Sequence, residues 1–559
     1  MLQKEVEQYL QIATDTSEAE VTIPEHAQFG HFSTNVALRL AKVRGKSPMD
    51  VAEDIADKLR HATPEKFFAK VEAVKPGFVN MWLTPEAIQG AFIEIAKAGE
   101  DWGKSGQEER RTVVVDYSAP NIAKPMGVGH LRSTIIGQAL YNVFKFNGWN
   151  AISDNHLGDW GKQFGVLIAA YKEDGKPEEV SIDYLMKLYV DYSARMKQDG
   201  ELGEAAKREV KKLQDGDEEN IAIWKKFYKV SLDEFERMYA MLGVSFDHTI
   251  GESFYNDRLA AVVSEALEKK VAVESEGAIV IPIEGSEAPM IIRKSDGAYL
   301  YPTTDIAAVK HRIKDFDADL LLYVVGNEQA LHFEQLFKAV KKLGIVTDQH
   351  MVHVKFGLML GEDMKKFSTR AGKTVSLFDL LQEAIARAKK VVDEKQPDLS
   401  EAEREAIANV VGIGAVKYND LSQNRQSDIV FNWDRMLSFE GNSGPYLQYA
   451  YARLKSILRK ANIHAFDAGS LKDEAELQVI LRLQEFPGVI EDITKNYFPH
   501  HLADYLYVLA KDVNAMYATV QVLKAEEAER NARLALIAAA AQTLKTGLSL
   551  LGIETVEQM

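Results

Sequence analysis

The 559-residue sequence contains no cysteine. This absence excludes disulfide bonds and every metal site built on thiolates, including cysteine-based zinc centres. It also fits a reducing compartment, where structural disulfides are rare. We therefore expect a cytoplasmic protein without zinc.

The sequence also lacks an apolar run of membrane length, an internal repeat and a low-complexity segment. Its first residues, "MLQKEVEQYLQIATDTSEAE", are polar and acidic, which is typical of neither a secretory signal nor a transit peptide. We expect no membrane association. The net charge of −16 argues against a broad surface that coats nucleic acid. A local basic site remains compatible with it, because affinity depends on charges near the phosphates.

The length exceeds what one hydrophobic core supports, so several domains are expected. The first, at 1–105, is an N-terminal α+β module whose end, "KVEAVKPGFVNMWLT", reads as a strand pair. The stretch "DWGKSGQEERR" (101–111) has the composition of a linker. A nucleotide-binding α/β domain follows at 106–375, with a charged helical insertion near 170–250, and 376–559 is nearly all helical in pattern.

The second domain opens on a strand, a glycine-containing turn and a helix. "TVVVDYS" (112–118) is β-rich with little polar alternation, which favours a parallel strand covered on both faces. In the following stretch, Leu131, Ile135, Ala139 and Val143 recur every four residues, and Gly148 ends the pattern. "NAISDN" then predicts a second strand. This order is the start of a doubly wound, Rossmann-like fold. Further along the chain, "APMIIRKSDGAYLY", with Ser295-Asp296-Gly297 as its turn, and "HVKFGLML" also read as strands.

Between strand and helix lies "SAPNIAKPMGVGHLRSTIIG", residues 118–137. A helix start presents free backbone N–H groups and partial positive charge, and both favour an anion such as phosphate. Gly127 and Gly129 let a ligand approach the backbone closely. His130 can donate a hydrogen bond to a phosphoryl oxygen, and Lys124 supplies a full charge. The alternative is a tight turn with a capping histidine.

The whole stretch resembles the "HIGH" signature region of class I aminoacyl-tRNA synthetases. Together with "NHLGDWGKQFG" (155–165) it looks specifically like arginyl-tRNA synthetase. "SDGAYLYPTTDIA", "YVVGNEQALHFEQ", "KKFSTRAGKTV" and "YNDLSQNRQSDIVFNWDRMLSFEGNSGPYLQYAYARLKS" follow in the family's order. The resemblance implies an ATP phosphate cradle. Its ATP-binding residues would be Pro120, Lys124, Gly127, Gly129, His130, Lys366 and Ser368.

Two departures from the family pattern concern catalysis. The family usually has His-x-Gly-His where this chain has Gly127 to His130, so the first histidine is absent. The second signature, Lys-Met-Ser-Lys, corresponds here to Lys366-Phe367-Ser368-Thr369, followed by Arg370. In the family, the lysine that matches Lys124 is believed to replace the missing second lysine. The resemblance thus implies a catalytic set of Lys124, His130, Lys366 and Arg370. Mg²⁺ would enter with ATP, since no dedicated metal cage is evident and His500-His501 reads as a helix-surface pair.

Tyr301 and Asp305 are four residues apart, so they share one face of a helix. A carboxylate beside an aromatic ring suits a guanidinium, although without further context an acidic helix start with a packed tyrosine is the more common arrangement. By resemblance, Tyr301, Asp305 and Glu252 hold the guanidinium of arginine. Asn121 and Gln329 bind its α-amino end, Asp116 lines the same pocket, and His130 lies between arginine and ATP.

Tyr446 and Tyr449 fall on one helix face and are followed by cations, among them Arg453. Aromatic rings beside cations bind unpaired bases and phosphates, but a tyrosine stripe also packs in cores. The resemblance implies that Tyr446, Tyr449, Tyr517 and Met559 contact the tRNA anticodon loop. It also implies that Phe78 and Asn80 contact the tRNA elbow.

The expected protein is therefore a monomeric, cytoplasmic arginine–tRNA ligase of class I, acting on L-arginine, ATP and tRNA(Arg). Its expected architecture is an N-terminal α+β module, a Rossmann-like catalytic domain with insertions, and a C-terminal helical anticodon-binding bundle. One alternative is another class I ligase, for cysteine, glutamate or glutamine. The acidic pocket would repel glutamate, and no cysteine-based zinc site supports the cysteine enzyme. The other alternative is an inactive relative that binds tRNA or senses arginine, which Gly127 alone favours.

Overall fold

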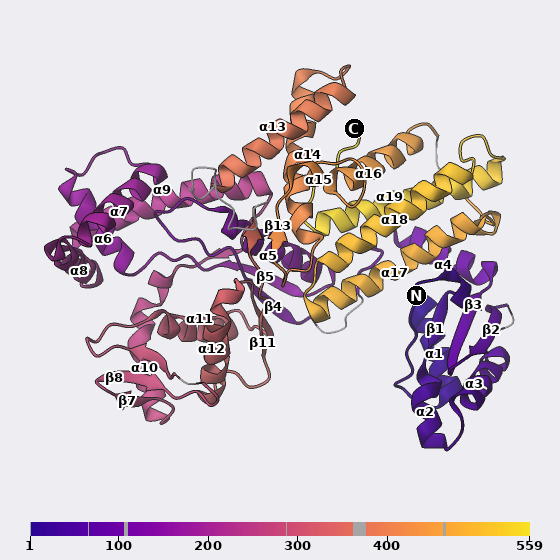
Figure 1. Cartoon of the computed structure of the whole chain (residues 1–559), viewed down its shortest axis with the longest axis horizontal. Helices are drawn as coiled ribbons and strands as arrows, with labels where there is room; N and C mark the ends of the chain where they lie inside the picture. Colours follow the sequence, from indigo (N-terminus) through magenta and orange to yellow (C-terminus); the bar gives the residue numbers. More distant parts are fainter. Residues whose placement is uncertain (1, 65, 106–109, 287, 362–375, 462–464) are drawn as a thin grey trace.

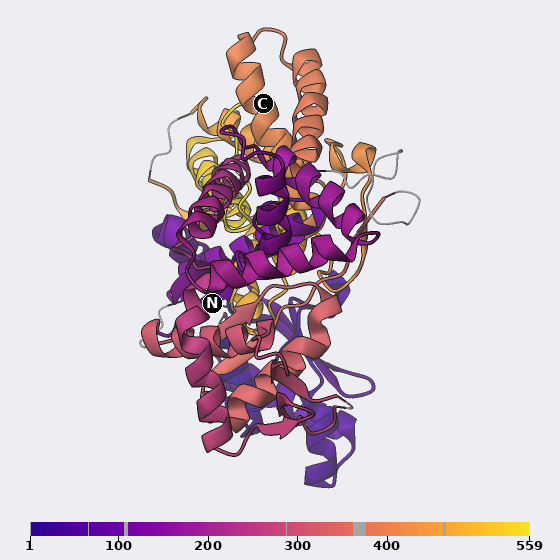
Figure 2. The ribbon, with the colours of Figure 1, turned by 90° about the vertical axis from the view of Figure 1, so that its left-hand side faces the viewer.

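The computed structural model describes residues 2–64, 66–105, 110–286, 288–361, 376–461 and 465–559. A small N-terminal module lies at one end of an elongated molecule, and the helical insertion lies at the other. The sheet of the catalytic domain and the C-terminal helices lie between them (Figure 1). In the turned view of Figure 2, the helices of the insertion lie in front and the N-terminal module lies behind. No helix of the described residues is long and apolar enough to span a membrane.

The N-terminal module is a three-stranded antiparallel sheet, of order β1-β3-β2, with helices beside it. The predicted strand pair is confirmed, because β2 and β3 pair antiparallel around Gly77. Ser47 and Thr84 cap α3 and α4 through their hydroxyls, each followed by proline at the first helical position. The elements are α1 (Leu2–Thr14), β1 (Phe32–Thr34), α2 (Val36–Arg44), α3 (Pro48–Ala62), β2 (Phe68–Val74), β3 (Phe78–Leu83) and α4 (Pro85–Ala98).

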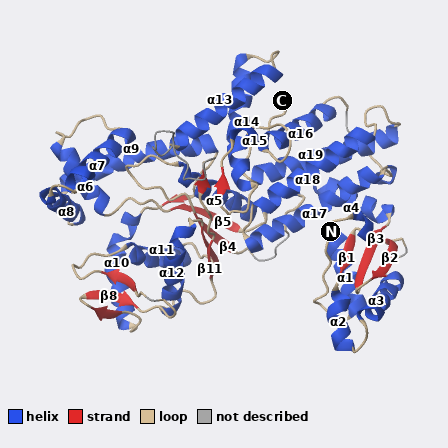
Figure 3. Ribbon diagram, in the orientation of Figure 1, coloured by secondary structure: helices blue, strands red, loops and turns tan. Residues whose placement is uncertain are grey.

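The catalytic domain is built on a parallel five-stranded sheet of order β11-β10-β4-β5-β6, drawn red in the centre of Figure 3. Its strands are β4 (Thr112–Asp116), β5 (Asn150–Asn155), β6 (His248–Thr249), β10 (Leu320–Tyr323) and β11 (His350–His353). Val113 and Val115 of β4 join one core while Val114 joins another, so both faces are covered as predicted. The chain leaves β4 toward β5 and later returns on its other side as β10. Ligands of doubly wound sheets bind where the strand order reverses, here at the carboxyl ends of β4 and β10.

Helices cover both faces of this sheet. α5 (Val128–Phe146) shares its core with Val113 and Val115, whereas α10 (Asn256–Glu268), α11 (Tyr301–Asp315) and α12 (Ala330–Lys342) share theirs with Val114. Gly137 sets the close approach of α5 to the sheet, since a Cβ there would lie 2.2 Å from Cγ of Tyr117. This contact holds the middle of α5 against the residue that follows β4.

Gly137→Ala is therefore expected to destabilise the protein by about 3 kcal/mol or more, because the new methyl overlaps a fully buried ring. Thermal unfolding should show a lowered midpoint. Gly90→Ala in α4 is the matched control, since its Cβ would meet nothing within 4 Å. That change should leave the midpoint unaltered or raise it, by about 0.5–1 kcal/mol of helix propensity. Equal midpoints for the two variants would contradict the packing described for α5.

The insertion near 170–250 is helical, as predicted, and leads into a small three-stranded sheet. Its elements are α6 (Lys162–Glu173), α7 (Ile182–Met196), α8 (Gly200–Gln214) and α9 (Glu218–Leu242), then β7 (Val273–Ser275), β8 (Ala278–Ile281) and β9 (Met290–Arg293).

Two stretches predicted as strands differ in the structure. Of the two strands expected in "APMIIRKSDGAYLY", the first forms as β9 and ends at Arg293, and the predicted turn is present, with positive φ at Gly297. The second strand does not form, because the chain enters α11 at Tyr301. The strand expected over "HVKFGLML" is broken after His353. Its second part, β12 (Met359–Leu360), pairs instead with β13 (Ile429–Val430) of a later segment. Gly357 permits this crossing, since a Cβ there would lie 2.6 Å from Oδ1 of Asp428.

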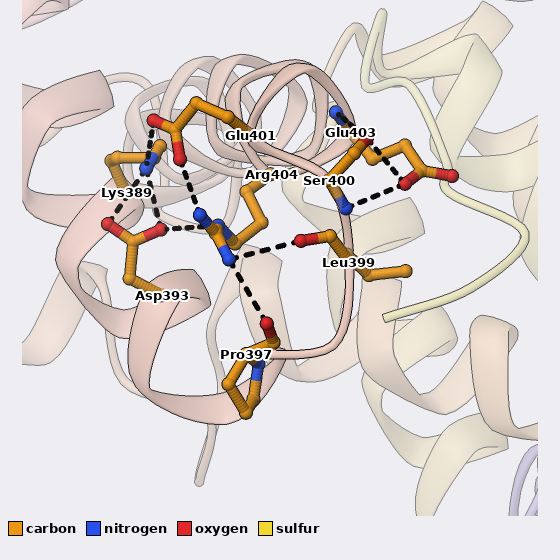
Figure 4. A network of polar contacts seen from close by, with 8 residues as sticks. All are labelled: Lys389, Asp393, Pro397, Leu399, Ser400, Glu401, Glu403 and Arg404. Atoms are coloured by element: carbon orange, nitrogen blue, oxygen red, sulfur yellow. Dashed lines mark hydrogen bonds and ion pairs between the residues drawn. The ribbon is translucent and has the colours of Figure 1, made fainter.

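The remainder of the described chain is helical, as predicted. α13 and α14 form a projecting hairpin whose end carries a polar network (Figure 4). There Lys389 lies 2.9 Å from Glu401, and Arg404 lies 2.9 Å from Asp393 and donates to the Leu399 carbonyl. The helices are α13 (Leu377–Lys395), α14 (Glu401–Leu421), α15 (Trp433–Met436), α16 (Gly444–Leu458), α17 (Glu474–Asn496), α18 (His500–Thr519) and α19 (Glu527–Leu550).

Candidate active site

The turn between β4 and α5, residues 117–127, lies at the carboxyl edge of the sheet where the strand order reverses. Its backbone is unusual, because Ser118, Ala119 and Ala123 all have positive φ, at 74°, 47° and 64°. Non-glycine residues rarely adopt this region, and such strain clusters at functional sites. The β4–α5 turn is therefore a preorganised loop rather than a simple connection.

His130 lies on the first turn of α5, and its Nδ1 accepts the backbone N–H of Gly127 at 3.0 Å. Nδ1 is thus an acceptor, so the ring proton of the neutral form resides on Nε2. Burial lowers the pKa of His130, and the charge of Lys124 lowers it further. At neutral pH, His130 presents a neutral ring with an Nε2–H donor at the helix start.

Lys124 is half-buried, and its Nζ lies 5.1 Å from the ring centroid of Tyr189 in α7. Gly127 precedes α5 with an ordinary extended backbone, φ −91°. Gly129 is exposed, and a Cβ there would meet nothing within 4 Å, which leaves space beside the helix start. Pro120 is buried, and its carbonyl accepts the N–H of Gly158. Lys366, Ser368 and Arg370 lie outside the described residues.

Asp116 ends β4 and is buried against the protein's own Arg312. The guanidinium of Arg312 is only 1% exposed and lies 2.7 Å from Asp116 and 2.8 Å from Asp154. Burial raises the pKa of Asp116, and Arg312 opposes that shift. Asp116 therefore borders the pocket with one oxygen already bound to an internal cation.

Three carboxylates, Asp159, Glu252 and Asp305, form a carboxylate cluster beside this strand end. Burial, together with the negative charges of Asp305 and Asp159, raises the pKa of Glu252 to about 8. Asp159 is buried and accepts the N–H and the hydroxyl of Ser253 at 2.8 and 2.6 Å. Within the described parts of the chain, no lysine or arginine lies within 4 Å of these three carboxylates. The cluster is an acidic pocket that favours a cation.

Asp305 points from α11 toward α12, where Oδ2 lies 2.6 Å from Nε2 of His332. The ring of His332 lies 4.7 Å from that of Tyr301, whose side chain is 58% exposed. Tyr301 and Asp305 both contact His332, as expected for residues four apart on one helix face. A planar guanidinium could stack on the exposed ring of Tyr301 and pair with the carboxylate of Asp305.

Asn121 and Gln329 occupy the two loops that flank the end of β4. Oδ1 of Asn121 packs so closely on Gly158 that a Cβ at that glycine would lie 2.2 Å away. Gln329 is exposed, in the short helix after β10. Both side chains thus lie at the same edge of the sheet as the carboxylate cluster, and their contact with a ligand stays a prediction.

Glu252 gives the site a predicted pH dependence. Its raised pKa means that the carboxyl is largely protonated at pH 7, whereas a bound guanidinium stabilises the charged form. If arginine binds here as the sequence predicts, its binding releases a proton, so the KM for arginine should fall as pH rises toward about 8, by up to about tenfold per unit.

Measurement of the KM for arginine in steady-state activation from about pH 6 to pH 9 tests this dependence. The Glu252→Gln variant has no titratable carboxyl at this position. This variant should show a flatter profile. Glu265→Gln on α10, whose carboxylate instead pairs with Lys269 and Lys310, is the matched control and should keep the wild-type slope. A profile of the Glu252→Gln enzyme parallel to that of the wild type would contradict the assignment.

The predicted tRNA-contacting tyrosines lie together on α16 and α18. Tyr449 is 43% exposed, and Oη of Tyr446 accepts a hydrogen bond from Asn514 at 3.1 Å. The guanidinium of Arg453 lies 4.8 Å from the ring of Tyr517. These helices thus present aromatic rings beside a cation, an arrangement suited to unpaired bases.

The other predicted tRNA contacts differ in exposure. Phe78 is 37% exposed at the start of β3, but Asn80 is only 3% exposed, and its Oδ1 accepts the hydroxyl of Ser33 at 2.7 Å. This placement leaves Asn80 little free surface. Met559 packs partly buried against a small core that includes Ala388 and Ile407. Contact of these residues with tRNA stays a prediction.

Sequence reasoning missed several residues of this site. Asp159 could have been found from the sequence, because it follows the carboxyl end of a predicted parallel strand, where ligands of such sheets bind. His332 and Arg312 carry no such signal, because each meets its carboxylate only through the packing of α11, α12 and the sheet. Among the described residues, no group of three or more histidine and carboxylate side chains could hold a metal ion.

Comparisons with known proteins cover nearly the whole chain. Residues 95–433 match the catalytic domain of class I tRNA synthetases (R), 447–559 match the DALR anticodon binding domain, and 1–83 match the arginyl tRNA synthetase N terminal domain. The chain is 41% identical to the arginine–tRNA ligase of Fusobacterium nucleatum, covering 97% of this chain and 95% of that protein. It is 44% identical to that of Lactococcus lactis, covering 94% and 93%.

A solved structure with the same fold is arginyl-tRNA synthetase from Plasmodium falciparum. It has a TM-score of 0.86 and 29% identity, covering 100% of this chain and 99% of that one. The Thermus thermophilus arginyl-tRNA synthetase has a TM-score of 0.85 and 25% identity, with full coverage of both chains. The agreement of three domain matches in one order with full-length relatives shows that the chain belongs to the arginyl-tRNA synthetase family of class I enzymes.

Proposed function

We propose that the chain is an arginine–tRNA ligase. In the first step, the carboxylate of L-arginine attacks the α-phosphorus of ATP. A P–O bond forms to the arginine, and the bond to the leaving pyrophosphate breaks, giving arginyl-adenylate. In the second step, the 2′-hydroxyl of the terminal adenosine of tRNA(Arg) attacks the arginyl carbonyl and AMP leaves. No covalent enzyme intermediate is required.

The observation that carries this proposal is the carboxylate cluster beside the β4–α5 turn. The cluster is an acidic pocket with no lysine or arginine within 4 Å among the described residues, and Tyr301 offers a ring at its edge. A guanidinium supplies the missing positive charge and a planar set of donors. A glutamate side chain would supply neither, and the neutral amide of glutamine would supply no charge.

Catalysis would be positioning and charge stabilisation. The Nε2–H of His130 and the N–H groups at the start of α5 would donate to phosphoryl oxygens, and Lys124 would add positive charge. Asp305 and Glu252 would hold the guanidinium, with Asn121 and Gln329 at the α-amino end. Lys366, Ser368 and Arg370 keep their predicted phosphate roles. Mg²⁺ would enter with ATP and neutralise phosphate charge.

The partners implied are L-arginine, ATP and tRNA(Arg). The aromatic and cationic surface of α16 and α18 would meet the anticodon loop, and the N-terminal module would meet the tRNA elbow. We propose that the protein acts as a monomer in the cytoplasm.

Pyrophosphate exchange with and without tRNA(Arg) tests the proposal. We expect exchange that depends on arginine and requires tRNA, as is usual in this family. Lysine serves as the matched control, because its ammonium has the same charge but not the planar donors of arginine. Exchange without tRNA would contradict the shared mechanism, and absence of arginine-dependent exchange under any condition would contradict the proposed function.

A further inference from the structure

Each positive-φ residue of the β4–α5 turn is held by a buried polar side chain. The N–H of Ser118 donates to Oγ of Ser133 at 2.9 Å, and the N–H of Ala119 donates to Oδ1 of Asn155 at 3.1 Å. Strained backbone persists only where its surroundings determine it fully. These partners are therefore part of what shapes the turn.

The third residue, Ala123, is held from the helical insertion. Its N–H donates to Oγ of Ser231 in α9 at 2.8 Å. Ser231 is fully buried, and its own hydroxyl proton goes to the carbonyl of Phe227 at 2.7 Å. The Ser231 hydroxyl thus donates a hydrogen bond within α9 and accepts one from the turn. Ala123 directly precedes Lys124, so this hydrogen bond fixes the backbone from which the lysine extends.

A second residue of α9 contacts the start of the turn. Oη of Tyr239 lies 2.8 Å from Oγ of Ser118 and accepts from Nδ2 of Asn155 at 3.1 Å. Since Asn155 also holds Ala119, one tyrosine hydroxyl connects two of the three strained positions. Tyr239 is 6% exposed, so this network is shielded from water.

The insertion also contacts the lysine itself. Nζ of Lys124 lies 5.1 Å from the ring of Tyr189 in α7, within the range of a cation–π interaction. Helix α9 thus holds the turn at Ser118 and at Ala123. Helix α7 contacts the side chain of Lys124. Within the described residues, these contacts connect the insertion directly to the groups that face ATP in the proposed function.

We propose that Ser231 and Tyr239 are positioning residues for adenylate formation, and that the helical insertion serves to hold the β4–α5 turn in its strained shape. This inference rests on the proposed function of the turn. Loss of either hydroxyl lets the backbone relax, which displaces Lys124 from the phosphate. Displacements of about 1 Å in such groups cost roughly a hundredfold in rate.

The test is single-turnover formation of arginyl-adenylate by Ser231→Ala, Ser231→Thr and Tyr239→Phe enzymes, with the complete chain, ATP, arginine and tRNA. We expect the rate to fall by about tenfold to a hundredfold for the Ala and Phe variants, with the KM for arginine within about twofold of wild type. The Thr variant retains a hydroxyl and should recover most of the rate. Hydrogen exchange of the peptide covering 118–126 should be faster in the Ala and Phe variants.

Thr543→Ala is the matched control, because its buried hydroxyl bonds only to the carbonyl of Ala539 within α19. It should keep the wild-type rate and the wild-type exchange pattern of residues 118–126. Unchanged rates in Ser231→Ala and Tyr239→Phe, or an equal rate loss in Thr543→Ala, would overturn the inference. Absence of arginyl-adenylate in the wild-type enzyme would instead overturn the proposed function.

Discussion

An Asp305→Ala enzyme is expected to lose arginine activation, with kcat/KM for arginine lowered by about a thousandfold. Truncating one partner of a buried charged pair typically costs about 2–5 kcal/mol, and each 1.36 kcal/mol is tenfold in rate. The change also removes the acceptor for Nε2 of His332 and one of the charges that define the carboxylate cluster. Pyrophosphate exchange at varied arginine concentration measures the loss.

Two further variants separate charge from structure. Asp305→Asn keeps an acceptor for His332 but removes the negative charge, so it should fail almost as badly as Ala. Asp315→Ala lies on the same helix and removes a carboxylate that also pairs with a histidine, His311, at the outer end of α11. It should activate arginine like wild type. Normal activation by Asp305→Ala would refute the pocket assignment.

His130→Asn should lower the rate of adenylate formation by about a hundredfold or more, the usual cost of one lost donor to developing charge. Asn can still accept the N–H of Gly127 through Oδ1, so the helix start is retained. What Asn lacks is a donor at the position of Nε2. The loss should therefore appear in the rate, and thermal stability should change little.

His130→Gln is the complementary variant, because its amide N–H reaches the position of Nε2. We expect Gln to recover part of the rate that Asn loses. Stopped-flow or quench measurements of the first turnover compare the two. Equal rates for both variants would mean that His130 acts only as a helix cap.

The local fold around the β4–α5 turn was predictable because its signals are local. Three consecutive valines flanked by turn residues encode a strand buried on both faces, and a four-residue apolar period encodes α5. The break after His353 was missed for the opposite reason. Gly357 lies beside Asp428, far along the chain, and no local pattern indicates that approach.

The site could be predicted only in outline. A helical spacing of four placed Tyr301 and Asp305 on one face, but their common partner His332 comes from another helix. Likewise Asp116, at the end of β4, pairs with Arg312 of α11, and the two meet only because α11 packs on the sheet. The raised pKa of Glu252 arises from burial beside two other carboxylates, which only the tertiary structure brings together.

The proposed domain limits at 105 and 375 stay predictions. The match to the catalytic domain extends to 433, and the match to the anticodon binding domain begins at 447, so α13 and α14 fall within the former. The pairing of β12 with β13 shows why a sequence boundary is hard to place here. These strands join segments on either side of 375 in one small sheet.

The central claim is that this chain charges tRNA with arginine although Gly127 replaces the first signature histidine. The direct measurement is aminoacylation of total tRNA with each amino acid separately, using ATP and Mg²⁺. We predict charging with arginine alone, which would show that the donor at His130 and the charge of Lys124 suffice. Retained tRNA binding without charging by any amino acid would contradict the account and identify a binding protein with the fold of a synthetase.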